Sequence, residues 1–260
     1  DLAIGLMAVP AMVPGLGVDS GSLFSVGMGV DPGALRDFAQ ARLDALASDP
    51  YECEYFADLD ASARQAREAL AQPLPPVAYG FRGIVAVFDD LDISAMQGVP
   101  PTEADAAVLV AIEDAPSLLM TASMFSPELA ALDIQPDGTP VALDLPQTAW
   151  LPEPPFVALT DDTLALATGD DSRQRIERVL AAKSADPAPF ISFAGDAGRY
   201  YGMVSEAVDT AGDTAELSPE ARAAIRDSMQ ALAAVYDRLQ VDVRFTRRGV
   251  TVDAGLTFKE

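Results

Sequence analysis

The 260-residue chain contains no histidine. This absence excludes Ser-His-Asp and Cys-His catalysis, histidine-ligated zinc and every histidine general base. Asparagine is absent as well, so the chain has no N-glycosylation sequon. Cys53 is the only cysteine, which excludes a disulfide framework and a thiolate metal cage. We expect Cys53 to be buried, the alternative being a partner upstream of Asp1.

Lysine is nearly absent, and the motifs that would use it are missing. The chain has only Lys183 and Lys259, and neither follows a serine at the Ser-x-x-Lys spacing. No P-loop is present, and Gly27-x-Gly29 lacks the final glycine of a dinucleotide fingerprint. The sequence therefore predicts no cofactor. Arginine supplies the remaining positive charge, and alanine is abundant, as is typical of high-GC bacterial genomes.

Positive charge is scarce overall, with 17 basic against 40 acidic residues and a net charge of −23. A chain this acidic is repelled by phosphate backbones, so we expect no nucleic-acid partner. Anionic membrane surfaces are disfavoured for the same reason. Half of the residues are hydrophobic, which is enough for a sizeable core. We interpret the charge mainly as a source of solubility.

The longest uncharged apolar stretch, residues 2–17, is too short for a transmembrane helix and is broken by Pro10, Pro14 and three glycines. We favour an irregular segment packed on its own core, the alternative being a flap that faces lipid or a partner. The chain begins at Asp1 rather than methionine, so we expect an upstream tag, signal peptide or lipoprotein leader.

Residues 217–258 predict a helix followed by a β-hairpin. Ser218-Pro219-Glu220 is a helix start, and apolar residues then recur every three to four positions as far as Leu239. The spacing changes to two from Val241, with a turn at residues 247–249. A helix followed by a hairpin favours an α+β fold, with antiparallel sheets and helices packed on one face.

Similar patterns predict the other elements. Strands are expected at residues 23–30, 77–88, 106–112, 156–160, 163–168 and 190–193, and helices at residues 31–48, 60–71, 115–124 and 172–180. Residues 205–216 are small and acidic, which is typical of an exposed loop.

An internal similarity indicates a duplicated module. Residues 81–87 resemble residues 247–253 at an offset of 166, and a helical pattern precedes each copy. The alternative is a chance match between strands rich in glycine, alanine and valine. We accordingly predict a first module at residues 1–96, a linker at residues 97–103 and a second module at residues 104–260.

With histidine absent and lysine and cysteine scarce, carboxylate side chains are the remaining candidates for metal binding or catalysis. Asp89, Asp90 and Asp92 follow a predicted strand and are candidate metal ligands, because calcium prefers such oxygen clusters. Paired carboxylates could also hydrolyse glycosides. The spacing matches no calcium loop, however, and aspartates are ordinary residues at turns and helix starts, which is the interpretation that we favour.

Four residues are candidates for contact with a ligand or partner. Arg199, Tyr200 and Tyr201 could line a polar pocket, because tyrosine and arginine are enriched at binding sites. Alternatively, they are half-buried residues at the end of a strand. Trp150 lies among prolines and could be an exposed contact residue or a lid over the core.

The strands and helix of residues 156–180, together with residues 217–258, resemble uncharacterised bacterial cell-envelope proteins, secreted or lipid-anchored, built from helix-plus-sheet units. The resemblance implies a periplasmic or envelope location and no known activity or site. Three functions stay open. The first is a non-catalytic envelope protein that binds or scaffolds a partner, the second a carrier of a hydrophobic or lipid ligand, and the third a carboxylate-based hydrolase. We rank them in that order, with the oligomeric state undecided.

Overall fold

The computed structural model describes residues 2–49, 57–91, 104–144, 148, 153–210 and 218–259. Within these residues the chain forms nine helices and nine strands, and the α+β class is confirmed. The helices are α1 (Leu2–Met7), α2 (Pro32–Ser48), α3 (Ala57–Ala71), α4 (Pro76–Gly80), α5 (Ala115–Phe125), α6 (Pro127–Ala130), α7 (Ser172–Ala181), α8 (Ala197–Thr210) and α9 (Pro219–Val235). The strands are β1 (Phe24–Gly29), β2 (Phe81–Leu91), β3 (Ala104–Ile112), β4 (Val141–Ala142), β5 (Phe156–Leu159), β6 (Thr163–Thr168), β7 (Ile191–Asp196), β8 (Tyr236–Thr246) and β9 (Gly249–Phe258).

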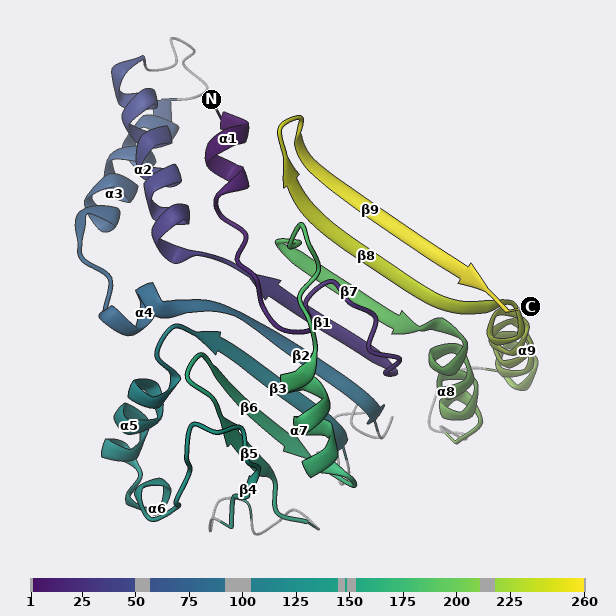
Figure 1. The fold of residues 1–260 in the computed structure, drawn as a ribbon. Coiled ribbons are helices and arrows are strands. Elements are labelled where there is room, and N and C mark those ends of the chain that lie inside the picture. The colour runs from purple at the N-terminus through teal and green to yellow at the C-terminus, as the bar shows by residue number, and fades with distance from the viewer. Residues whose placement is uncertain are drawn as a thin grey trace.

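The strands form one sheet in the order β4-β5-β6-β3-β2-β1-β7-β8-β9, and every neighbouring pair is antiparallel (Figure 1). The sheet is continuous across the predicted boundary between modules, because β2 pairs with β3 along most of its length. The predicted linker, residues 97–103, lies outside the described residues, and the division into modules stays a prediction.

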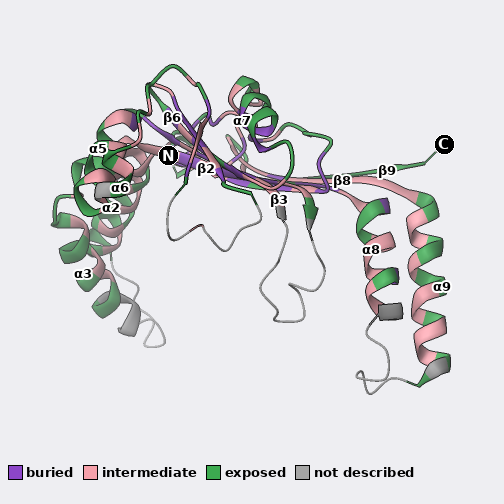
Figure 2. Ribbon diagram, turned by 90° about the horizontal axis from the view of Figure 1, so that it is seen from below, coloured by how far each residue is buried: buried purple, intermediate pink, exposed green. Residues whose placement is uncertain are grey.

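Helices lie on both faces of the sheet and not on one face alone (Figure 2). Helix α7 lies on one side, while the hairpins α2–α3 and α8–α9 project from the other side at opposite ends of the sheet. We call the side of α7 the covered face and the opposite side the open face. This asymmetry between the two faces positions the candidate site.

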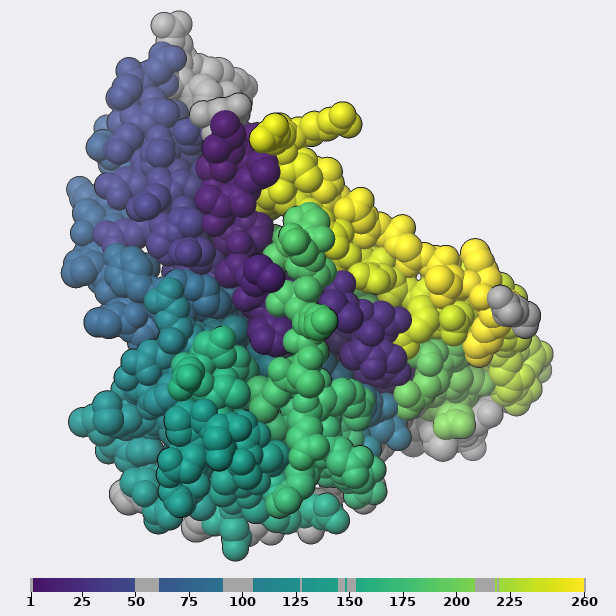
Figure 3. All heavy atoms as spheres, viewed as in Figure 1, coloured from purple at the N-terminus to yellow at the C-terminus, as the bar shows by residue number. Residues whose placement is uncertain are grey.

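The larger of two hydrophobic clusters in the described residues lies on the covered face. Val85 and Leu109 point from β2 and β3 toward Ile176 of α7, and all three are almost fully buried. Val13 and Leu16 from the N-terminal segment join the same core, so the chain before β1 completes it. Figure 3 shows this segment (purple) lying over the covered face beside the chain that follows α7 (green). A smaller cluster joins Ile112, Ala115 and Leu159, and Leu164 of β6 packs against it.

Residues 9–16 pack as the favoured interpretation of the N-terminal segment predicts. The backbone N–H of Gly15 donates to the carbonyl of Lys183, and that of Ala185 donates to the carbonyl of Leu16. Earlier in the segment, Leu2 and Ile4 of α1 remain more than half exposed. Within the described residues no helix combines the length and apolar character that crossing a membrane requires.

The C-terminal helix and hairpin form as predicted. The Ser218 hydroxyl accepts a hydrogen bond from the N–H of Ala221 at 3.2 Å and caps α9, as serine at this position favours. Strands β8 and β9 pair directly after the helix, and Thr246 lies opposite Gly249 across a two-residue turn. The boundary was predicted too late, because the helical spacing was read as far as Leu239, whereas α9 ends at Val235 and β8 begins at Tyr236.

Two other segments differ from the prediction. Residues 76–80 form α4 where a strand was expected, because Pro76 favours the first turn of a helix. Residues 205–210 belong to α8, not to a loop. The Asp196 carboxylate accepts from the N–H of Arg199 at the start of α8, and α8 packs on α9, so tertiary packing overrides weak local propensity.

The sheet contains two units with a similar order of elements. In one, α2, α3 and the short α4 connect β1 to its partner β2; in the other, α8 and α9 connect β7 to its partner β8. Because β1 and β7 are antiparallel neighbours, the units lie on opposite sides of this pair, as in a two-fold arrangement. The offset of 166 equates β2 with β9, whereas the topology equates β2 with β8. The duplication stays a hypothesis, with this revised correspondence.

Gly83 is required at the start of β2, and this generates a stability prediction. Its φ is +152°, and a Cβ there would overlap the Met28 carbonyl oxygen and approach Val13 Cγ2 at 2.6 Å. We expect Gly83→Ala to lower the free energy of unfolding by roughly 2 kcal/mol or more, because strain adds to the clash. Chemical denaturation monitored by circular dichroism measures this change.

Gly202→Ala in α8 is the matched control. Its Cβ would meet nothing within 4 Å, and alanine favours a helix by roughly 0.5–1 kcal/mol over glycine. The same chemical change should therefore stabilise the protein at Gly202 and destabilise it at Gly83. A neutral Gly83→Ala would contradict the described packing between β1, β2 and the N-terminal segment.

Candidate functional site

The open face carries a row of apolar side chains that crosses seven strands. Cross-strand partners in an antiparallel sheet project to the same side, so the register traces the row residue by residue. From β6 to β9 its members are Leu166, Val108, Ala86, Val26, Phe193, Val241 and Ala254. All seven side chains are apolar.

Two further rows lie on either side of the first. One consists of Leu164, Val110, Ile84, Met28, Ile191, Val243 and Val252. The other consists of Thr168, Ala106, Phe88, Phe24, Gly195, Leu239 and Leu256. The Thr168 hydroxyl is the one polar side-chain group in the three rows. We call these rows together the apolar surface.

The apolar surface is accessible over much of its extent, although Leu164 at its β6 end packs against the buried Leu159 and Ala115. Val26 is 42% exposed and Ile191 is 40% exposed, whereas Val85 and Leu109 on the covered face are 4% and 1% exposed. On β9, at the edge of the sheet, Val252 is 64% exposed. Contiguous exposed apolar surface of this kind is typical of a ligand or partner site.

The dimensions of the apolar surface follow from strand geometry. Seven strands spaced by about 4.8 Å span about 29 Å, and three rows at alternate residues extend roughly 13 Å along the strands. Figure 2 shows the hairpins α2–α3 and α8–α9 on this side, one near each end of the sheet. An elongated apolar molecule could therefore lie across the strands between the two hairpins.

Strand β8 shows that the apolar surface is not a by-product of an ordinary amphipathic sheet. Sheets with one solvated face usually place apolar residues inward and polar residues outward. On β8 this order is inverted, because Gln240, Asp242 and Arg244 point to the covered face while Val241 and Val243 lie on the open face. Asp242 is 4% exposed and is the one buried residue of β8, whereas Val241 and Val243 are only partly buried.

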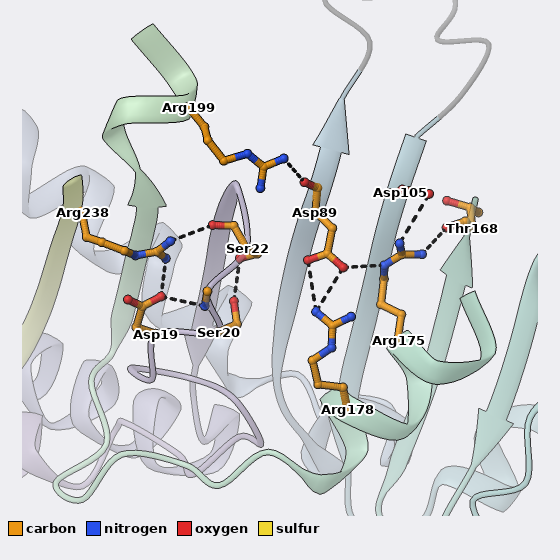
Figure 4. A network of polar contacts seen from close by, with 11 residues as sticks. Asp19, Ser20, Ser22, Asp89, Asp105, Thr168, Arg175, Arg178, Arg199 and Arg238 are labelled. Carbon is orange, nitrogen blue, oxygen red and sulfur yellow. Dashed lines mark hydrogen bonds and ion pairs between the residues drawn. The ribbon is translucent and has the colours of Figure 1, made fainter. Parts of the chain in front are cut away.

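These polar residues of β8 hold the N-terminal segment. Gln240 donates to the Gly17 carbonyl at 3.3 Å and to the Asp242 carboxylate at 3.0 Å. Arg238 donates to the Ser22 carbonyl at 3.0 Å and forms an ion pair with Asp19 (Figure 4). The hydrogen-bonding groups of β8 are thus used on the covered face, which leaves its open face apolar.

Asp89, a candidate metal ligand, is surrounded by arginines instead (Figure 4). Its carboxylate oxygen lies 2.9 Å from Arg175 Nε and 3.1 Å from an Arg178 nitrogen, and Arg199 donates to its backbone carbonyl at 2.8 Å. Arg175 also lies 3.4 Å from Asp105. Because guanidinium groups occupy the oxygens of Asp89, a structural role explains this residue better than cation binding.

The other two candidate metal ligands add no support for a metal site. Asp90 is exposed near the end of β2, and Asp92 lies outside the described residues. Among the residues that the structure describes, no group of three or more carboxylate or cysteine side chains is arranged to hold a metal ion.

Surface aspartates elsewhere serve helix caps and turns. Hydrogen bonds from the hydroxyl and the N–H of Ser117 lower the pKa of Asp114, which caps α5. Hydrogen bonds from Thr139, mainly from its N–H, lower the pKa of Asp137. A general acid needs a raised pKa, so neither group has the property that the hydrolase hypothesis requires.

Arg199, Tyr200 and Tyr201 lie in the first turns of α8 and not at the end of a strand. Ring centroids connect Tyr200 to Tyr201 at 5.6 Å and Tyr201 to Tyr236 at 6.1 Å. Tyr236 in turn lies 5.5 Å from Phe258. The structure thus joins two predicted contact residues to an aromatic group where β8 begins and β9 ends.

The remaining predicted contact residue, Trp150, lies outside the described residues, and so does Cys53, which was expected to be buried. Sequence analysis did not predict the apolar surface. The alternation of β8 and β9 was visible, but the direction in which each set of side chains points depends on what covers the sheet.

The ion pairs of Asp89 generate a prediction about stability. Arg175 is 3% exposed, and without Asp89 its nearest described carboxylate would be that of Asp105 at 3.4 Å, so its buried charge would be less well compensated. We expect Asp89→Ala to reduce the free energy of unfolding by roughly 3 kcal/mol. Asp37→Ala, on the exposed side of α2, should change it by less than about 0.5 kcal/mol. Equal effects of both changes would show that the arginines do not depend on Asp89.

Comparison with known proteins leaves the identity of the chain open. No family profile, no curated protein and no solved structure matches it. The functional argument therefore rests on the geometry of this chain, and above all on the apolar surface.

Proposed function

We propose that the protein is a binding protein for a hydrophobic ligand of lipid type, which lies on the apolar surface of the sheet. The main support is the apolar composition of the three rows. They extend over seven strands and contain one side-chain hydroxyl, that of Thr168. Covering such a surface with an apolar molecule lowers the free energy of the system, because the apolar side chains are removed from water.

The lack of polar groups favours an acyl chain over a folded protein as the occupant. Protein interfaces usually carry about one hydrogen bond per 100–200 Å² and include a polar rim. Acyl chains need no hydrogen-bond partners. Covering roughly 400 Å² of apolar surface would contribute on the order of 10 kcal/mol before the costs of association are subtracted.

Among the three functions that the sequence left open, the proposal favours the carrier of a hydrophobic or lipid ligand. A role in partner binding or scaffolding stays a prediction, and so does the periplasmic or envelope location. The hydrolase hypothesis gains no support, because the carboxylates described above serve ion pairs, caps and turns. The ligand itself is defined here only by its chemistry, as an elongated and predominantly apolar molecule.

A substitution at the centre of the apolar surface tests the proposal. Val26 lies in the middle strand of the seven and is 42% exposed, so aspartate can replace it without burial inside the free protein. The test uses the fluorescence of Nile red, a neutral dye, with lysophosphatidylcholine as competitor. We expect Val26→Asp to raise the dissociation constants of Nile red and of lysophosphatidylcholine at least tenfold, because a bound acyl chain would desolvate the carboxylate.

Gln174→Glu on α7 is the matched control, because it also adds one negative charge but lies on the covered side. It should leave both dissociation constants unchanged. Circular dichroism would verify that both variants are folded. Equal binding by Val26→Asp and the unchanged protein would exclude the apolar surface as the site, and absence of binding by the unchanged protein would exclude the proposed ligand class.

A further inference from the structure

Strand β9 ends the sheet with an exposed edge. It pairs with β8 on one side, and in the described part of the chain no strand pairs with its other side (Figure 1). Its side chains are exposed along most of the strand, with Val250 at 58% and Phe258 at 60%. An edge of this length is a template for the addition of another strand.

The register identifies the backbone groups that point outward from β9. The N–H of Phe190 donates to the carbonyl of Val243 at 2.8 Å, so the backbone polar groups of Val243 face β7. Because these directions alternate along a strand, the backbone groups of Asp242 and Arg244 face β9. Their partners on β9 are Asp253 and Thr251, which therefore bond to β8. The N–H and C=O groups that point outward belong to Val250, Val252, Ala254 and Leu256.

Strand β9 lacks most of the features that protect natural edges. Such edges are blunted by proline, by bulges or by several charged residues. Residues 249–258 contain no proline and a single charged residue, Asp253. The irregularity in the β8–β9 pairing lies between Tyr236 and Leu239, at the end of the hairpin that is opposite the turn.

The charge of this hairpin differs from that of the rest of the chain. Residues 236–259 contain five basic and three acidic residues, a net charge of +2, whereas the whole chain carries −23. Two copies of the chain repel each other through most of their surfaces, and the β8–β9 hairpin is a region where this repulsion is relieved. A second copy can therefore approach at this edge.

We propose that β9 pairs with β9 of a second copy, antiparallel and around a two-fold axis at Ala254. This register places Ala254 opposite Ala254 of the second copy. It also places Val252 opposite Leu256, Thr251 opposite Thr257, and Val250 opposite Phe258. β-branched, hydroxyl and aromatic pairs of these kinds stabilise neighbouring strands.

Charge disfavours one of the two neighbouring registers. A shift by one residue pair would place the axis at Asp253, so that two carboxylates would face each other directly. With the axis at Ala254, Asp253 lies opposite Gly255, which has no side chain. Both registers would satisfy the outward N–H and C=O groups, so the difference between them lies in the side chains.

The pairing would join the two apolar surfaces into one. A two-fold axis perpendicular to the sheet keeps the open faces of both copies on the same side. Val252, Ala254 and Leu256 end the three rows on β9 and would then meet the equivalent rows of the second copy. This inference is independent of the ligand, because the edge would pair whether or not lipid binds.

The proposal is tested by introducing a charge at Ala254 and measuring the mass of the protein in solution. Sedimentation equilibrium of the unchanged protein should give twice the 27.3 kDa of the chain. Ala254→Asp and Ala254→Lys should each reduce the mass to that of one chain, because like charges would meet on the axis. An equimolar mixture of the two variants should restore the dimer, because the charges are then opposite.

Ala234→Lys is the control, because it introduces the same charge at an exposed position of α9. It should remain dimeric. A monomeric unchanged protein, or a dimer that persists in either Ala254 variant, would overturn the proposal. Two monomeric variants that fail to recombine would overturn the register. Nile red binding by the unchanged protein, measured separately, would distinguish this result from a failure of the proposed function, because Ala254 itself lies in the apolar surface.

Discussion

The structure depends on an unequal covering of the two faces of a nine-stranded sheet. Each strand projects alternate side chains to two sides, so a face without a covering is either polar and solvated or apolar and available to a ligand or partner. Here α7 and residues 9–16 cover one side and bury Val85 and Leu109 almost completely. The other side keeps its apolar side chains accessible, and this imbalance is the basis of the functional argument.

The burial of Asp242 on β8 supports the inference that the open face is apolar for a functional reason. Burying Asp242 is unfavourable unless its charge is compensated, and Gln240 and Arg244 both donate to its carboxylate at 3.0 Å. The same strand leaves Val241 and Val243 on the open face. A chain that needed only a stable sheet would gain by reversing this order, so we infer that the open face is apolar because of what it binds.

Local periodicity predicted much of the fold. The cap at Ser218 located the start of α9, and the alternation from Val241 located most of β8 and β9, because each signal lies within a short stretch. The helical spacing that was read as far as Leu239 was wrong for residues 236–239, which begin β8. Helix α8 was missed, since residues 197–210 include two glycines and two adjacent tyrosines and their helical form depends on packing against α9.

The candidate site could not be predicted in the same way. Leu166 and Ala254 belong to one row only because seven strands lie in a particular order, and no local pattern specifies that order. Similarly, the sequence presented Asp89 as one of three neighbouring carboxylates. Its arginine partners lie 86 and more residues further along the chain, and only the fold brings them together.

The most direct test of the central claim is methyl NMR with a lysophosphatidylcholine that carries a nitroxide on its acyl chain. The nitroxide broadens the signals of nearby methyl groups. If the ligand lies on the open face, signals of Val26, Ile84 and Ile191 should broaden more strongly than those of Val85 and Ile176 on the covered face. Broadening confined to the covered face, or no broadening at a saturating concentration, would contradict the account.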